Sequence, residues 1–173
     1  MSLIVKNILR LIVVLFIQVF ILKSLPPLHG MAVPYFYFIL ILWLPFKTTR
    51  AALLFYAFFL GMIVDVFYKT PGLHTAICLL LAYIRPFVVN LLLPKESTEW
   101  GENAPTRFTM GFIQYATFVI FLTIVHNAYL IFLEWMQFGD FLYFIGKLFV
   151  TSFISLLLIF ISEMLVNRKT SHR

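Results

Sequence analysis

The chain has 173 residues, of which 62% are apolar and 12% are charged, and its formal net charge is +6. A water-soluble domain of this length cannot bury that much Leu, Ile, Val and Phe, whereas a bilayer accepts these residues on the outer faces of helices. The basic residues stand at the ends of apolar stretches and form no folded basic surface, which excludes nucleic-acid binding, and the single cysteine, Cys78, excludes an internal disulfide.

Apolar stretches in chain order predict six membrane spans, separated by short clusters of charge, Pro and Gly. A span needs about 20 apolar residues, or fewer where the bilayer thins. The expected spans are about Leu3 to Leu25, Met31 to Phe46, Ala51 to Tyr68, Pro71 to Leu93, Phe108 to Glu134 and Phe141 to Val166. Because backbone polar groups in lipid must be satisfied within a helix, residues 1–173 are predicted to form one all-α membrane domain, a bundle of six transmembrane helices.

The basic residues between the spans predict the orientation of the chain. Two basic residues, Lys23 and Lys69, fall on one side of the membrane, and nine fall on the other side. The side with more Lys and Arg should be the cytoplasmic one. Those nine are Lys6, Arg10, Lys47, Arg50, Lys95, Arg107, Arg168, Lys169 and Arg173. We therefore expect both termini in the cytoplasm.

Asp65 is the most informative polar residue, because an ionisable group within a span is costly. Ala57, Gly61 and Asp65 are four residues apart and share one face of the third span. Small residues on that face allow another helix to approach closely. We predict that Asp65 accepts a hydrogen bond from His74 or from the first backbone amides of the fourth span. A structural bond, a contact with a partner protein, and ligand or proton chemistry are three interpretations of this residue.

Arg85 lies about fourteen residues into the fourth span, or ~20 Å along a helix, which is too far to pair with Asp65. It is expected either to reach the cytoplasmic side or to bind carbonyls that Pro86 leaves without a helix hydrogen bond. Other polar residues in the spans are expected to have structural roles. His126 is expected to form an interhelical hydrogen bond, and Lys147 to extend toward Asp140. Glu163 is expected to pair with Arg168 or Lys169.

No residue pattern indicates an enzyme. Carboxylate pairs, histidine clusters and activated nucleophiles are the usual signs of catalysis. Here Glu96, Glu99 and Glu102 share a polar loop with Ser, Gly and Asn, which is typical of a solvated loop, and the four histidines have no metal-ligand spacing. We expect no reaction chemistry, no cofactor and no metal.

The segment FLGMIVDVFYKTPGLHTAICLLLAYIRP, residues 59–86, resembles the rod shape-determining protein MreD family of bacterial inner-membrane proteins. The family pattern is a Gly, an Asp four residues later, and a short Pro-Gly turn before Leu-His, which opens a Leu-rich helix. The matching residues are Gly61, Asp65, Pro71, Gly72, Leu73 and His74. The stretch from Ala82 to Pro86, which includes Arg85, is similar to the variant in Bacteroidetes-like members.

The resemblance implies a non-enzymatic scaffold in the complex that inserts peptidoglycan along the side wall of rod-shaped cells. The implied direct partner is the bitopic protein MreC, which connects to MreB filaments, the RodA glycosyltransferase and a penicillin-binding transpeptidase. It also implies a location in the cytoplasmic membrane, among lipid, and a helix arrangement similar to the substrate-binding S-components of energy-coupling-factor vitamin importers. The candidates for packing or partner contact are Ala57, Gly61, Asp65, Pro71, Gly72, His74, Arg85 and Pro86.

A second function stays open, namely a substrate-binding subunit of a vitamin or small-molecule importer. That function needs a polar pocket open to the outside, for which Asp65, His74, His126 and Asn127 are the available residues. An integral-membrane enzyme is the third alternative, and it has no residue constellation to support it.

Overall fold

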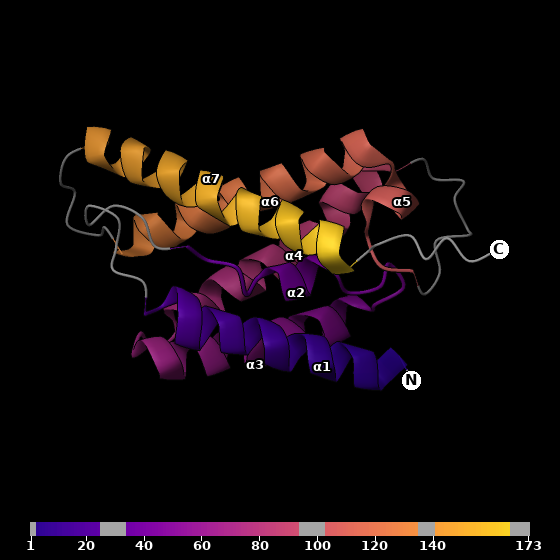
Figure 1. The fold of residues 1–173 in the computed structure, drawn as a ribbon, viewed down its shortest axis with the longest axis horizontal. Coiled ribbons are helices and arrows are strands. Elements are labelled where there is room, and N and C mark those ends of the chain that lie inside the picture. The colour runs from indigo at the N-terminus through magenta and orange to yellow at the C-terminus, as the bar shows by residue number, and fades with distance from the viewer. Residues whose placement is uncertain (1–2, 25–33, 94–102, 135–140, 167–173) are drawn as a thin grey trace.

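The structure is a computed structural model that describes residues 3–24, 34–93, 103–134 and 141–166 (Figure 1). Every regular element in these residues is helical. The elements are α1 (Leu3–Phe16), the π-helix η1 (Ile17–Leu22), α2 (Ile39–Leu42), α3 (Arg50–Tyr68), α4 (Leu73–Leu92), α5 (Arg107–Met110), α6 (Phe112–Glu134) and α7 (Phe141–Val166).

Four helices, α3, α4, α6 and α7, are long and apolar enough to cross a membrane, with mean hydropathy between 1.9 and 2.3. A shorter apolar helical run covers Ile8–Leu22. At most 44% of the most apolar stretch of each long helix is buried inside the protein. More than half of each stretch is therefore not buried by the protein itself, which fits hydrocarbon rather than water as the surrounding medium. These helices match the third to sixth predicted spans, and four apolar helices of this length fit an all-α multi-pass membrane protein.

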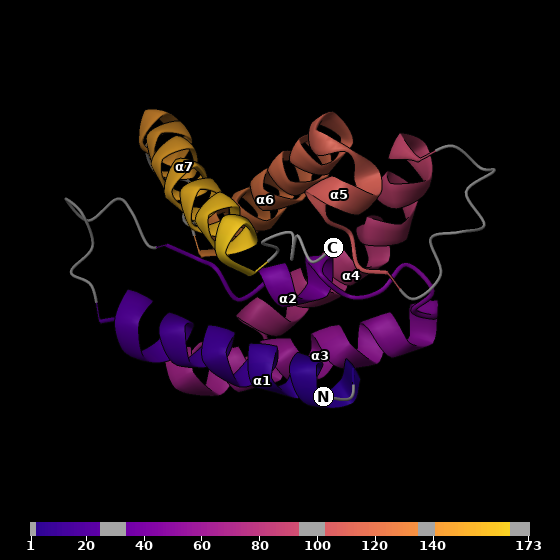
Figure 2. The same cartoon turned by 45° about the vertical axis from the view of Figure 1, so that its right-hand side comes forward.

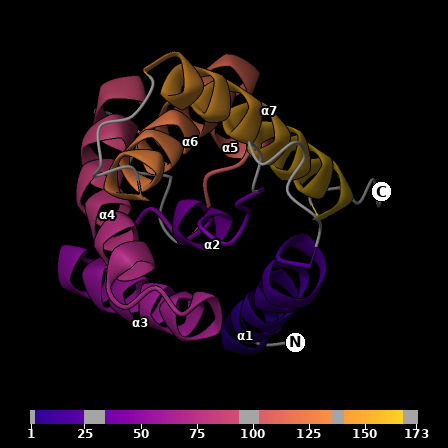
Figure 3. The ribbon, with the colours of Figure 1, turned by 90° about the vertical axis from the view of Figure 1, so that its left-hand side faces the viewer.

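The helices run along the long axis of the molecule, and α1 begins at the end where α7 finishes (Figure 1). Helices α6 and α7 form one layer and α1 and α3 the other, with α2 between them (Figure 2). Viewed along the bundle, the long helices and α1 form a ring with α2 inside it (Figure 3). We call the end with Arg50 and Arg107 the arginine end, and the end with Lys23 and Lys69 the lysine end.

The second predicted span, Met31 to Phe46, does not form a continuous helix in its described residues 34–46, so the expectation that this span is α-helical was wrong. Residues 34–36 have no regular structure, residues 37–38 form a turn, and α2 contains only four residues. All residues from 34 to 43 are buried. Irregular backbone is tolerated at membrane depth where protein, not lipid, surrounds it. Residues 34–46, the central segment, lie in such an enclosure.

The central segment connects the two ends of the bundle. At the lysine end, the Tyr35 hydroxyl donates a hydrogen bond to Glu134 Oε1 in the last turn of α6, over 3.2 Å. At the arginine end, the Phe46 amide donates to the Asn103 carbonyl, over 3.1 Å. Between these points, the Trp43 indole donates to the Tyr115 hydroxyl in the first turn of α6, over 3.4 Å. The segment therefore traverses the bundle interior without forming a full helix.

The fifth predicted span, Phe108 to Glu134, is divided near its start. Thr106 caps the short helix α5 through a capping box with Thr109. Gly111 then has φ of 87°, a backbone conformation that glycine adopts without steric cost, and α6 begins at Phe112. The remaining 23 residues are long enough to cross a bilayer.

Candidate functional site

Asp65 joins α3 to α4 through a set of hydrogen bonds that we call the hairpin cap. Its carboxylate accepts from the backbone amides of Gly72 (3.1 Å), His74 (2.8 Å) and Thr75 (3.0 Å). It also accepts from the hydroxyls of Thr70 (3.1 Å) and Thr75 (2.6 Å). These amides belong to the N-terminal turn of α4, where unpaired N–H groups and the helix dipole favour an anion. The predicted bond from the first backbone amides of the fourth span is therefore present.

Gly61 allows α3 and α4 to come into backbone contact one turn below the hairpin cap. A Cβ atom at this position would lie 2.4 Å from Thr75 Cα and 2.9 Å from the His74 carbonyl oxygen. Ala57, one turn further along the same face, is completely buried. The small-residue face expected from the sequence is therefore a helix-packing face. The turn itself contains Pro71 and Gly72, and Gly72 has φ of 83°.

The His74 imidazole does not contact the Asp65 carboxylate. It belongs instead to a buried polar cluster formed by Tyr37, His74, His126, Asn127 and Ser152. The Tyr37 hydroxyl lies 2.9 Å from His74 Nδ1 and 2.9 Å from His126 Nε2. His126 Nδ1 lies 2.9 Å from Asn127 Oδ1, and Asn127 Nδ2 donates to Ser152 Oγ over 3.1 Å.

The donors and acceptors of this polar cluster fit a single hydrogen-bonding direction. Since Asn127 Oδ1 can only accept, a neutral His126 carries its proton on Nδ1 and accepts from the Tyr37 hydroxyl at Nε2. The Tyr37 oxygen then accepts from the Nδ1–H group of His74. His126 therefore bonds to Tyr37, which lies in the turn before α2, and to Asn127 in its own helix, whereas the sequence predicted a bond to another helix. The cluster ties the central segment to α4, α6 and α7.

Gln18 in η1 supports the backbone of the central segment, a role that we did not predict. Its Oε1 accepts from the amides of Phe36 (2.7 Å) and Tyr37 (3.2 Å), and its Nε2 donates to the Pro34 carbonyl (3.2 Å). Nε2 also donates to the Tyr68 hydroxyl over 2.6 Å. Gln18 is completely buried. An isolated amide within the apolar run LIVVLFIQVFIL was the sequence signal that could have identified it.

Arg85 supports the other end of the central segment. Its guanidinium Nη2 donates to the carbonyls of Leu42 and Leu44. Leu42 is the last residue of α2, and Leu44 follows it two residues later. Arg85 is 3% exposed. The sequence suggested the cytoplasmic side or carbonyls freed by Pro86, and the carbonyls that Arg85 binds belong instead to the central segment. Pro86 lies within α4, which continues to Leu92.

Two further polar residues, Lys147 and Glu163, have partners that the sequence did not predict. Lys147 Nζ forms an ion pair with Glu134 Oε2 at 2.9 Å, and Asp140, its expected partner, lies outside the described residues. Glu163 accepts from the Tyr115 hydroxyl (3.0 Å) and the Arg107 amide (3.3 Å). Residues 168 and 169, the partners expected for Glu163, are also outside the described residues.

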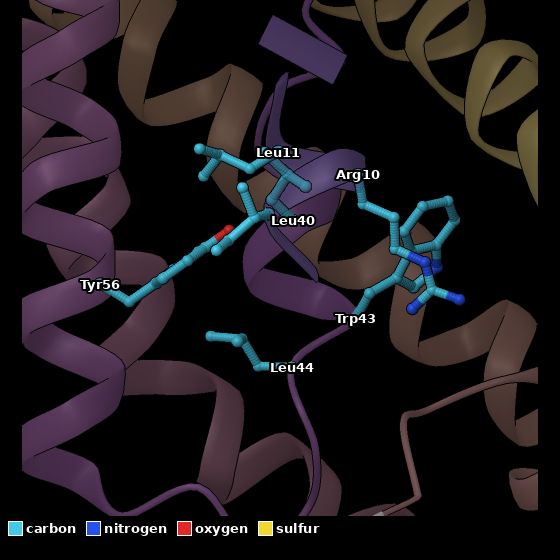
Figure 4. Close-up of a pocket in the computed structure, with 7 residues that line it drawn as sticks. Arg10, Leu11, Leu40, Trp43, Leu44 and Tyr56 are labelled. Carbon is cyan, nitrogen blue, oxygen red and sulfur yellow. The ribbon is translucent and has the colours of Figure 1, made fainter. Parts of the chain in front are cut away.

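Apolar hollows lie between the helices. A cavity of about 310 Å³ between α1, α2 and α3 is lined by Leu11, Leu40 and Tyr56 (Figure 4). Arg10 and Trp43 also line this cavity, and the Arg10 guanidinium lies 5.8 Å from the centre of the Trp43 ring. A second hollow of about 290 Å³, the lateral groove, lies between α6 and α7 and contains Ile124, Ser152, Phe153 and Leu156. Neither hollow has a carboxylate among its lining residues.

Within the described part of the chain, no group of three or more His, Cys, Asp or Glu side chains is placed to hold a metal ion. Comparisons of the chain with protein-family models, with curated proteins and with solved structures found no match.

Proposed function

We propose that this chain is a non-enzymatic membrane scaffold of the bacterial cell-elongation complex, which binds an MreC-like bitopic partner and helps to maintain rod shape. The resemblance of residues 59–86 to the MreD family suggests the cellular process. The hairpin cap is the single observation that carries the structural part. Its Asp65 carboxylate, the most informative polar group in the sequence, is committed to five internal hydrogen bonds. The group therefore holds α3 against α4 and is not free for reaction chemistry.

We further propose that the chain crosses the cytoplasmic membrane six times, with the arginine end in the cytoplasm. The fact that α1 begins and α7 finishes at the same end of the bundle supports an even number of crossings. Counting α1 with η1 and the central segment as crossings, in addition to the four long helices, gives six. A bundle of this kind, similar to that of the importer S-components, presents mainly lateral helix surfaces.

The lateral groove offers a surface for a transmembrane helix of the partner. It is apolar, it opens on the side of the bundle, and Phe149 and Phe153 on α7 are 73% and 56% exposed. Helices in lipid associate through close packing rather than through exclusion of water. An aromatic groove between two diverging helices supplies such packing. MreB, RodA and the transpeptidase would then be linked through the bound partner.

Co-purification with the MreC-like partner from detergent-solubilised membranes tests the proposal. We expect Phe153→Ala to reduce partner recovery at least about tenfold, which corresponds to ~1.4 kcal/mol of binding free energy. Phe121→Ala is the matched control, since Phe121 is a 47% exposed aromatic residue of α6 that does not line the groove. Equal recovery with both variants would refute this docking surface, and recovery of no such partner by the unmodified chain would refute the scaffold function.

The importer-subunit alternative has less structural support. His74, His126 and Asn127, three of the residues available for an outward polar pocket, are at most 1% exposed and bond within the polar cluster. A ligand at this level would have to replace these internal bonds. A vitamin that raises the thermal stability of the purified chain would restore this alternative.

A further inference from the structure

A polar cavity of about 280 Å³ lies at the arginine end, between the start of α3 and the second half of α4. We call it the arginine cavity, because Arg50 and Arg85 both line it. Thr49 and Asn90 contribute a hydroxyl and an amide, and Val89 and Pro86 are among the apolar lining residues. None of the residues that line it is acidic. The cavity therefore carries positive charge without a carboxylate of its own.

Arg85 is the unusual component of this cavity. The residue is 3% exposed, and its charge meets the carbonyls of Leu42 and Leu44 rather than a carboxylate. Its Nε–H group has no hydrogen-bond partner within the described residues. A buried charge without a counter-ion and a buried donor without an acceptor are both costly. An anion in the adjoining cavity would offset both costs.

The start of α3 adds a second source of positive potential. Thr49 is the N-cap residue, and its Oγ1 accepts from the Ala52 amide over 3.3 Å. The Thr49 carbonyl accepts from the Leu53 amide. The amides of Arg50 and Ala51 precede the first intrahelical bond, so helix geometry provides them with no partner. N–H groups at such a helix end, together with the helix dipole, favour phosphate binding.

Arg50 is held in place beside the cavity by an aromatic ring. Its guanidinium lies 5.4 Å from the centre of the Phe87 ring, the residue after Pro86. Stacking of this kind leaves the edge of the planar guanidinium available for two parallel bonds to an oxyanion. The cavity thus combines two arginines, a helix N-terminus and the Thr49 hydroxyl.

We propose that the arginine cavity binds a phosphate oxyanion, and that its source is the headgroup of an anionic phospholipid in the adjacent leaflet. The position favours a lipid, because the cavity lies where a membrane-spanning helix begins and where headgroups surround the protein. Arg50 and Arg85 would bind the phosphate oxygens, while the acyl chains would lie along the exposed apolar faces of α3 and α4. This lipid site does not depend on the scaffold function, and it adds a ligand to the protein.

Native mass spectrometry of the full chain in detergent tests this site. The delipidated protein is titrated separately with dioleoyl phosphatidylglycerol, with dioleoylglycerol, which lacks the phosphate, and with inorganic phosphate. We expect phosphatidylglycerol to bind at least about tenfold more tightly than dioleoylglycerol, and Arg50→Gln to remove about tenfold of that affinity. Lys47→Gln is the matched control, because Lys47 is an exposed basic residue at the same end that does not line the cavity. It should change the affinity less than about twofold.

The outcomes distinguish the possible ligands. Equal phosphatidylglycerol binding by the unmodified chain and Arg50→Gln, or equal loss in Arg50→Gln and Lys47→Gln, would overturn the site. Equal binding of phosphatidylglycerol and dioleoylglycerol would also overturn it. If inorganic phosphate binds as tightly as phosphatidylglycerol and Arg50→Gln abolishes both, the phosphate site stands and its lipid source is wrong. Because Arg85 also supports the central segment, Arg85→Gln is informative only where the variant remains folded, and Arg50→Gln decides the question.

Discussion

Replacing Asp65 by alanine removes the acceptor for every bond of the hairpin cap. The Asp65 carboxylate accepts hydrogen bonds from three backbone amides. Two of them are the amides of His74, which is buried, and of Thr75, which is half-buried. A buried donor left without a partner costs about 1–3 kcal/mol, and loss of the anion at a helix N-terminus adds ~0.3–1 kcal/mol. The Gly72 amide is at an exposed residue and can bond to water. We therefore expect Asp65→Ala to lower the free energy of unfolding by about 3 kcal/mol.

Two related variants separate charge from hydrogen bonding. Asp65→Asn keeps one acceptor oxygen and loses the charge, so it should cost about half as much, ~1–2 kcal/mol. Thr70→Val removes a single hydroxyl donor, which contacts Asp65 Oδ1, and should cost under about 1 kcal/mol. If the hairpin cap stabilises the protein as described, the loss of unfolding free energy should be largest for Asp65→Ala, smaller for Asp65→Asn and smallest for Thr70→Val.

Titration of sodium dodecyl sulfate into detergent micelles measures these unfolding free energies. Hydrogen exchange at the His74 and Thr75 amides reports the local effect, and both amides should exchange faster in Asp65→Ala. An unfolding free energy for Asp65→Ala within about 0.5 kcal/mol of the unmodified chain would refute the reasoning. Unchanged exchange at both amides would refute it independently of global stability.

Two other substitutions test the packing of the bundle by the same unfolding measurement. Gly61→Ala should lower the free energy of unfolding by about 1–3 kcal/mol, because the added Cβ would lie 2.4 Å from Thr75 Cα. Gly146→Ala is the control, since a Cβ there would have nothing within 4 Å, and it should be neutral or stabilising by ~0.5–1 kcal/mol. Equal effects would contradict the close contact of α3 and α4. Gln18→Leu should cost ~2–4 kcal/mol, because two buried amides of the central segment lose their acceptor, while Gln114→Leu at an exposed site of α6 should have little effect. A stable Gln18→Leu variant would show that Gln18 does not support that segment.

The long helices could be predicted from the sequence because each contains its own evidence. An uninterrupted apolar run and a polar break at either end suffice to locate α3, α4, α6 and α7 within a few residues. The contact between Asp65 and α4 was also predictable, since both partners lie within ten residues of each other and the spacing from Gly61 defines the packing face. Local sequence therefore determines these features.

The central segment could not be predicted, because its conformation depends on residues far away in the chain. Residues 34–43 are apolar enough to resemble a span, yet their backbone groups bond to Gln18, to Arg85 and, through the Tyr35 amide, to Ser155 at 3.3 Å. None of these distant partners is marked by a local pattern. Tyr37 was overlooked for the same reason, since a tyrosine in an apolar run carries no sign that it links two histidines.

The enclosed position of the central segment sets an order for biogenesis. Residues 34–38 expose peptide groups that hydrocarbon cannot solvate, and the side chains that satisfy them come from α7 as well as from η1. A nascent chain that has released only its first three elements into the bilayer has not yet made Ser155. The Tyr35 amide therefore finds this acceptor only after the last helix has been made.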